Sequence, residues 1–179
     1  MKARTTRLQG FTLVELLIVI VIIAIVAAIT VVAYNGIQNR ANDSAVQSDI
    51  RGFAQVIELM NSRDSSYPTG GSATGDSTAF PGVTFKPSKG SYSTVNSNFY
   101  YCSGKISGNQ AFIIAAQSKS GAVFVYTSAA GSVTKATSGT AYTNCHSASF
   151  DAGTIAYSYG FYATTQAWWP WTNTPSPSI

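Results

Sequence analysis

The first third of the chain carries two successive hydrophobic patterns. Residues 16–39 contain no charge over 24 positions, and residues 16–29 are Leu, Ile, Val and Ala. A helix needs roughly 20 apolar residues to cross ~30 Å of hydrocarbon, so this run is long enough for a membrane span. Farther on, apolar residues recur at spacings of 4, 3, 4 and 3, on one face of a helix: Val46, Ile50, Phe53, Ile57 and Met60. The two patterns predict one helix over about residues 11–60.

A polar segment and then strand patterns follow. Residues 61–75, NSRDSSYPTGGSATG, hold the Pro and Gly signals that end a helix. Runs rich in β-branched and aromatic residues predict strands, and SKSG and AAGS read as hairpin connections around the third of them: 98–102, 110–117, 122–128 and 154–163. We expect an antiparallel sheet with one face on the helix and the other toward solvent. The fold class is therefore α+β.

Charge is scarce and unevenly placed. Only 10% of the residues are charged, whereas about 25% is usual for a soluble domain. Lys2, Arg4 and Arg7 precede the apolar run with no acid among them, and they supply most of the net charge of +4. Positive residues just before a span stay in the cytoplasm. We therefore expect a single-pass membrane protein whose leader is cytoplasmic and whose globular part lies outside.

One acid, Glu15, interrupts the start of the apolar run. A secretory signal would have a shorter apolar core and a small-residue cleavage site, for which residues 31–33 are a weak match. A plain membrane anchor gives no reason for the acid, because a charge at the centre of a span costs ~2.5 to 3.5 kcal/mol on insertion scales. Neither interpretation accounts for Glu15.

Residues 10–28, GFTLVELLIVIVIIAIVAA, closely resemble the N-terminal signature of type IV prepilins and the related pseudopilins. The resemblance implies cleavage by a prepilin peptidase between Gly10 and Phe11, followed by N-methylation of Phe11. It also implies that Glu15 meets the N-terminal amine of a neighbouring subunit. A buried charge is tolerated when it is paired, so Glu15 would fix the register of assembly.

The resemblance also implies the organisation of the chain. It predicts the pilin fold, one long N-terminal helix packed on an antiparallel sheet, with four segments: a leader (1–10), a transmembrane and assembly half of the helix (11–35), an amphipathic half (36–62) and an extracytoplasmic β head (63–179). Implied partners are other pilin subunits, the peptidase, an assembly platform protein and ATPase, and membrane lipid before assembly. Many pilins carry a helix-breaking proline where this chain has Val32, so we do not carry over the melted segment that this proline gives.

Two cysteines, Cys102 and Cys145, lie in the head. Outside the cytoplasm such a pair suggests one disulfide, although free buried thiols are the alternative. Zinc fits poorly, because only His146 could join them and four ligands are usual. The family often has a disulfide that bounds a variable loop of the head.

The C-terminal tail holds three tryptophans, Trp168, Trp169 and Trp171. We favour packing against the sheet or a neighbouring subunit, and the alternative is an exposed patch that contacts another surface. Enzymatic chemistry has little support, because His146 is the single histidine and the serines have no His/Asp context. No metal, cofactor or small-molecule substrate is expected. Scattered lysines without arginine are typical of a solvated surface, so DNA ranks low among the partners.

The sequence thus predicts a structural subunit of a type IV pilus-like filament that acts in adhesion, motility or DNA uptake. The first alternative is a type II secretion or competence pseudopilin. Major secretion pseudopilins tend to lack this disulfide and to hold calcium in an acidic C-terminal loop, for which the chain shows no cluster of acids. The second alternative is a single-span, membrane-anchored surface-binding module.

Overall fold

A computed structural model describes residues 11–69, 80, 85–95, 97–146, 150–151, 156–162 and 167–168. The chain divides into two compact units, residues 1–38 and 39–179. Helix α1 extends over Leu13–Asp64 without a break. It begins two residues later and ends four residues later than the predicted 11–60. Gly36 and Gly52 both lie inside this helix.

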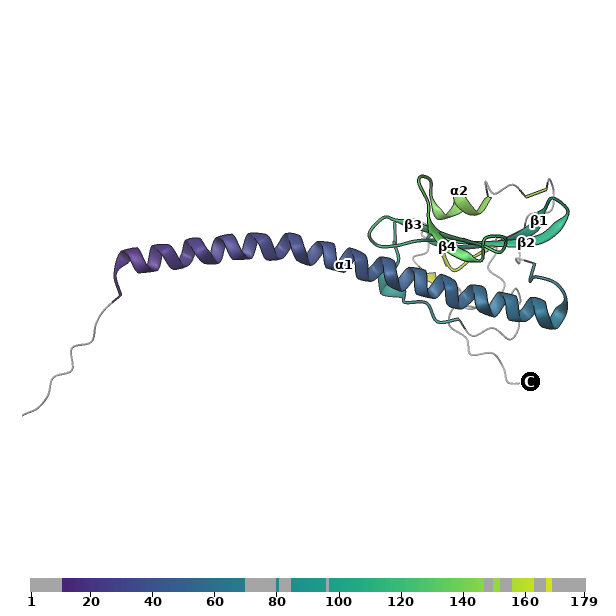
Figure 1. The fold of residues 1–179 in the computed structure, drawn as a ribbon, viewed down its shortest axis with the longest axis horizontal. Coiled ribbons are helices and arrows are strands. Elements are labelled where there is room, and N and C mark those ends of the chain that lie inside the picture. The colour runs from purple at the N-terminus through teal and green to yellow at the C-terminus, as the bar shows by residue number, and fades with distance from the viewer. Residues whose placement is uncertain are drawn as a thin grey trace, which may run out of the picture. The chain divides into compact units, whose positions relative to one another are not determined.

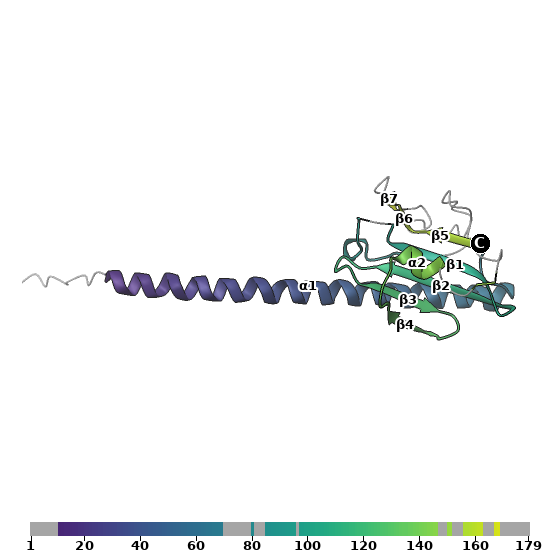
Figure 2. The ribbon, with the colours of Figure 1, turned by 90° about the horizontal axis from the view of Figure 1, so that it is seen from above.

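In the second unit, the strands form an antiparallel meander with one added strand. The strands β1 (Phe99–Ile106), β2 (Asn109–Gln117), β3 (Val123–Thr127), β4 (Ser132–Lys135) and β5 (Ala156–Tyr159) lie in the order β4-β3-β2-β1-β5 (Figure 2). Two short strands, β6 (Phe161–Tyr162) and β7 (Ala167–Trp168), pair separately. A 3-10 turn, Lys89–Ser91, and a short helix α2, Ala141–His146, complete the described elements.

The predicted α+β fold is confirmed, and three of its details change. Strand β4 and helix α2 were not predicted. The predicted strand over 154–163 is divided at Gly160 into β5, which pairs with β1, and β6, which pairs with β7. β1 and β2 join through Ser107 and Gly108, whose φ angles are +52° and +80°. Positive φ at both central residues matches the twist of a two-residue hairpin.

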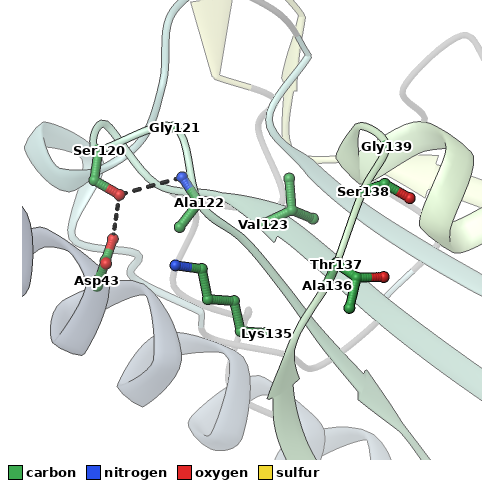
Figure 3. A pocket seen from close by; sticks show the side chains of 10 residues that line it. All are labelled: Asp43, Ser120, Gly121, Ala122, Val123, Lys135, Ala136, Thr137, Ser138 and Gly139. Carbon is green, nitrogen blue, oxygen red and sulfur yellow. Dashed lines mark hydrogen bonds between the residues drawn. The ribbon is translucent and has the colours of Figure 1, made fainter.

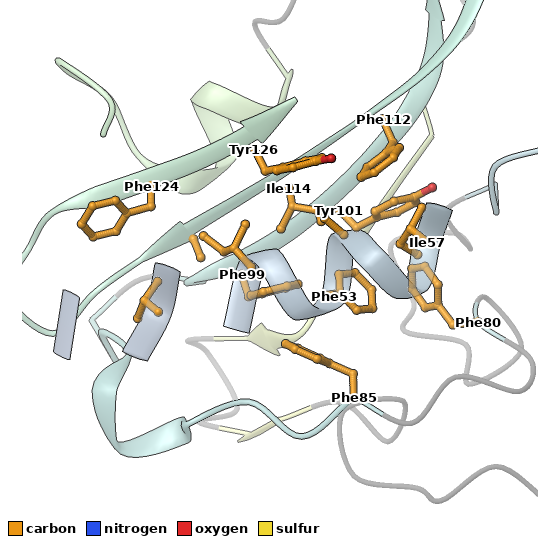
Figure 4. Close-up of a cluster of buried hydrophobic side chains, with 14 of the residues drawn as sticks. Phe53, Ile57, Phe80, Phe85, Phe99, Tyr101, Phe112, Ile114, Phe124 and Tyr126 are labelled. Atoms are coloured by element: carbon orange, nitrogen blue, oxygen red, sulfur yellow. The ribbon is translucent and has the colours of Figure 1, made fainter. Parts of the chain in front are cut away.

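The main core lies between one face of the sheet and the amphipathic stripe of α1. All five predicted stripe residues, Val46, Ile50, Phe53, Ile57 and Met60, are buried. Phe53 stands at the centre of an aromatic cluster, with ring centroids 4.6 Å from Phe85 and 5.5 Å from Phe99 (Figure 4). The stripe therefore fixes which side of α1 meets the sheet.

The other face of the sheet carries α2, so our expectation that this face is turned toward solvent was wrong where α2 lies. Figure 1 shows α2 on the side of the sheet opposite to α1. Ala141 and Cys145 of α2 pack with Tyr100, Cys102 and Ala115 in a second buried cluster. Small residues at 115 and 141 allow the close approach. The head thus has three layers where α2 lies and two layers elsewhere.

Candidate assembly site

The N-terminus of α1 is closed by a capping box. The backbone N–H of Glu15 donates to the Thr12 hydroxyl (3.2 Å), and the backbone N–H of Thr12 donates to Oε2 of Glu15 (2.8 Å). The Thr12 hydroxyl also donates to Oε2 (2.8 Å). A Thr and a Glu three residues apart satisfy reciprocally two of the N–H groups that a helix start leaves without partners. Glu15 therefore has a structural role within its own chain.

Sequence reasoning missed Thr12. The signal was present, because T-x-x-E directly before an apolar run is the sequence form of a capping box. The negative carboxylate also lies in the first turn, where it meets the positive end of the helix dipole.

Behind this cap, α1 exposes apolar side chains on every side. Exposed fractions range from 48% at Val19 to 82% at Leu13, and Phe11, before the helix, is 87% exposed. The most apolar 18-residue stretch has a mean hydropathy of 3.5, and none of it is buried. A soluble monomer rarely leaves so large an apolar surface in water. The segment is long and apolar enough to cross a membrane, by length and composition alone.

Of the other predicted residues, the two cysteines form the expected bond. Cys102 on β1 and Cys145 on α2 form a disulfide and are both fully buried. The bond joins the outer face of the sheet to α2. It confirms the predicted pairing and gives it a role that the sequence did not show.

Trp168 is half-buried at the edge of the main core. Its ring centroid lies 5.2 Å from that of Tyr92 and 5.5 Å from that of Phe161, and Lys89 Nζ lies 5.5 Å from the indole centroid. Such edge and cation–π contacts fix an aromatic ring in place. Gly10, Trp169 and Trp171 lie outside the described residues.

The described acids and the histidine of the head have structural surroundings. The described residues contain no group of three or more His, Cys, Asp or Glu that could hold a metal ion. His146 lies at the end of α2 with its ring 4.1 Å from that of Tyr142, and burial lowers the pKa of its imidazole. The acids Asp49 and Asp151 accept hydrogen bonds from Tyr92 and from backbone amides of 88, 107 and 108. These acids stabilise loops of the head.

One comparison with known proteins gives a match. Residues 6–31 fit the family model described as the prokaryotic N-terminal methylation motif, the type IV pilin and prepilin-type signature. The match covers the capping box and most of the exposed apolar segment. Comparisons with curated proteins and with solved structures give no match.

Proposed function

We propose that this chain, which carries the prepilin-type methylation motif, is a structural subunit of a type IV pilus-like filament. The observation that carries the proposal is that the motif, at residues 6–31, overlaps an apolar stretch of α1 that none of the described residues buries. Lipid covers this surface before assembly, and the same surfaces of neighbouring subunits cover it afterwards. The chain acts by assembly and not by catalysis.

The proposal divides the chain by task. Residues 1–10 are the cytoplasmic leader, which a prepilin peptidase removes before the Phe11 amine is methylated. Residues 11–35 span the membrane and later form the filament core. Residues 36–62 attach to the head, and residues 63–179 form the head outside the membrane. An assembly platform and its ATPase move the subunit from lipid into the filament.

Glu15 has two oxygens and two tasks in this proposal. Both donors from Thr12 reach Oε2, and Oε1 has no hydrogen bond from the described residues. Cleavage after Gly10 creates a positive amine at Phe11. In apolar surroundings an unpaired charge is costly and a paired one is tolerated. A subunit is therefore stabilised where its amine reaches Oε1 of a neighbour, while Oε2 keeps the helix start closed.

Two substitutions at one position test this role. Glu15→Gln keeps the size of the side chain and an oxygen for the Thr12 donors but removes the charge, and Glu15→Ala removes both. We expect sheared cell-surface filaments to be lost in both variants, with the processed chain still present in the membrane fraction by immunoblot. Normal filament yield from Glu15→Gln would show that the charge does not guide assembly.

The same experiment separates the alternatives. In a membrane-anchored surface-binding module, Glu15→Ala is harmless or improves insertion, and the chain keeps its leader or loses it after the apolar span. In a pseudopilin, the substitution abolishes secretion or DNA uptake in cells that show no surface filament of this chain even before mutation. Loss of a visible filament together with retained membrane protein supports the pilus subunit alone.

A further inference from the structure

A polar cavity opens beside α1 in the head (Figure 3). Its volume is about 440 Å³. The walls come from three places, namely α1, the turn between β2 and β3, and the end of β4 with the residues after it. The lining residues are Asp43, Ser120, Gly121, Ala122, Val123, Lys135, Ala136, Thr137, Ser138 and Gly139.

The cavity holds one charge of each sign. Asp43 uses Oδ1 to accept a hydrogen bond from the Ser120 hydroxyl, and Ser120 in turn accepts one from the backbone N–H of Ala122 (3.2 Å). Lys135 ends strand β4 and is exposed, and its side-chain amine has no hydrogen bond or ion pair with the described residues. Figure 3 shows the Lys135 amine on the side of the cavity where Asp43 and Ala122 lie. The cavity therefore exposes the Lys135 amine and the Asp43 carboxylate to the same partner.

The lining suits charged side chains better than a small organic ligand. Small-molecule sites are mostly lined by large apolar and aromatic groups. Here Val123 is the largest apolar residue in the wall, and the others are small or polar. A partner with its own pair of opposite charges would match both Lys135 and Asp43.

The same head carries such a pair at the end of α1. Arg63 donates two hydrogen bonds to the Asp64 carboxylate, from Nε to Oδ1 (2.8 Å) and from Nη2 to Oδ2 (2.7 Å). The two side chains remain 54% and 44% exposed. The pair therefore faces solvent with one charge of each sign, as the cavity does with Asp43 and Lys135.

Asp64 is the distinctive member of this pair. Among the described residues of 39–151 it is the one exposed acid, because Asp43, Asp49, Glu58 and Asp151 are partly buried. Exposed cations are several: Arg40, Arg51, Arg63, Lys86, Lys105, Lys119 and Lys135. Of these exposed cations, only Lys135 lines the cavity described above together with a carboxylate.

We propose that the Arg63–Asp64 pair of one copy docks in this cavity of another copy, with Asp64 against Lys135 and Arg63 against Asp43. The inference rests on the proposed function, because it places the contact within a filament of this chain. The two surfaces lie at different places on the head, so the contact is heterologous, and it repeats as an open helix where the rotation between copies does not close a ring. That is the symmetry that a helical filament requires.

The spacing along α1 sets the geometry of the contact. Asp43 and Arg63 are twenty residues apart, which corresponds to ~30 Å along a helix. Two subunits joined in this way are therefore displaced by ~30 Å along the α1 axis. A single exposed ion pair contributes little, so the contact acts through repetition at every subunit and through the order that it imposes.

Charge reversal tests the pairing. Lys135→Glu and Asp64→Lys each place like charges at the contact, and we expect about a fivefold or greater fall in the yield of filaments that survive shearing. The combined variant restores opposite charges and should return to within about twofold of the unmodified chain. Lys105→Glu, at an exposed cation outside the cavity, is the matched control and should leave the yield unchanged. Equal losses in the double variant and in the singles would overturn the pairing.

Cross-linking gives a second readout that does not depend on yield. Filaments of the Asp64→Cys and Lys135→Cys double variant should give a ladder of covalent multimers after mild oxidation, on a non-reducing gel. The Asp64→Cys and Lys105→Cys pair should give none. The native disulfide does not interfere, because Cys102 and Cys145 are fully buried.

The outcomes separate this inference from the function on which it rests. Filaments that form with subunits beginning at Phe11, without a ladder and without sensitivity to the charges, overturn the docking contact and leave the filament function standing. If the unmodified chain forms no filament and is not processed, both proposals fail.

Discussion

Removal of the disulfide should strongly destabilise the head. The bond joins residues 43 positions apart, and the chain-entropy model gives ~4 kcal/mol for a loop of that length. Helix α2 has six residues, too few to be stable alone, so its position depends on the bond and on contacts with Tyr100 and Ala115. Reduction should therefore release α2 and weaken the outer layer of the sheet.

The assay compares oxidised protein, reduced protein and a Cys102→Ser, Cys145→Ser variant, each full-length in mild detergent. Guanidinium unfolding is followed by tryptophan fluorescence, to which Trp168 beside Tyr92 contributes. With a slope of about 4 kcal/mol per molar, the midpoint should fall by about 1 M on reduction. The variant should match the reduced protein. A shift below about 0.2 M in both would refute the reasoning, because it would mean that packing alone holds α2.

Three further predictions concern other parts of the molecule. Thr12→Val removes the capping hydroxyl and should destabilise the helix start by ~1 kcal/mol. In detergent, hydrogen exchange at the Glu15 amide should become about fivefold faster, whereas Thr12→Ser should leave it unchanged. Phe53→Ala should lower the free energy of unfolding by about 3 to 5 kcal/mol. Leu59 is 71% exposed on the same helix, so Leu59→Ala should change it by no more than about 0.5 kcal/mol. Equal effects of the two substitutions would contradict the assignment of the core. Burial raises the pKa of the Tyr92 and Tyr101 hydroxyls, so these groups lose their protons in the unfolded chain at a lower pH than in the folded one. The free energy of unfolding should therefore be constant below about pH 10 and fall above it, by ~1.4 kcal/mol per pH unit for each tyrosine. Urea midpoints that stay level from pH 9 to 11 would contradict this.

The core face of α1 was predictable because five apolar residues repeat with helical spacing over four turns. That signal comes from many positions at once, and the structure buries all five. The central strands were predictable for a similar reason, since β1, β2 and β3 are rich in β-branched and aromatic residues. Their ends moved by a few residues, because hydrogen bonding and turn geometry, not composition, decide where a strand stops.

Helix α2 was not predictable from periodicity. AYTNCH is shorter than two full turns, and its cap lies in Thr140, whose hydroxyl accepts the Thr143 N–H at 3.2 Å. The disulfide was expected from the compartment, yet only the structure shows that Cys145 attaches a helix to the outer face of the sheet. Short elements fixed by one cap and one covalent bond leave a weak pattern in the sequence.

The cavity that holds Asp43 and Lys135 could not be predicted from the sequence either. Asp43 and Lys135 are 92 positions apart and become neighbours only because β4 pairs with β3 at the edge of the sheet that lies near α1. Strand β4 has four residues, SVTK, which carry no recognisable pattern. The cavity therefore depends on an element that sequence reasoning did not find.

The most direct test of the central claim is the mass and N-terminal sequence of the protein recovered from cells. The account predicts a chain that begins at N-methylated Phe11, the product of cleavage after Gly10. A chain that begins at Met1 would indicate a plain anchor, and one that begins near Tyr34 would indicate a secreted domain. Either result would contradict assembly through Phe11 and Glu15.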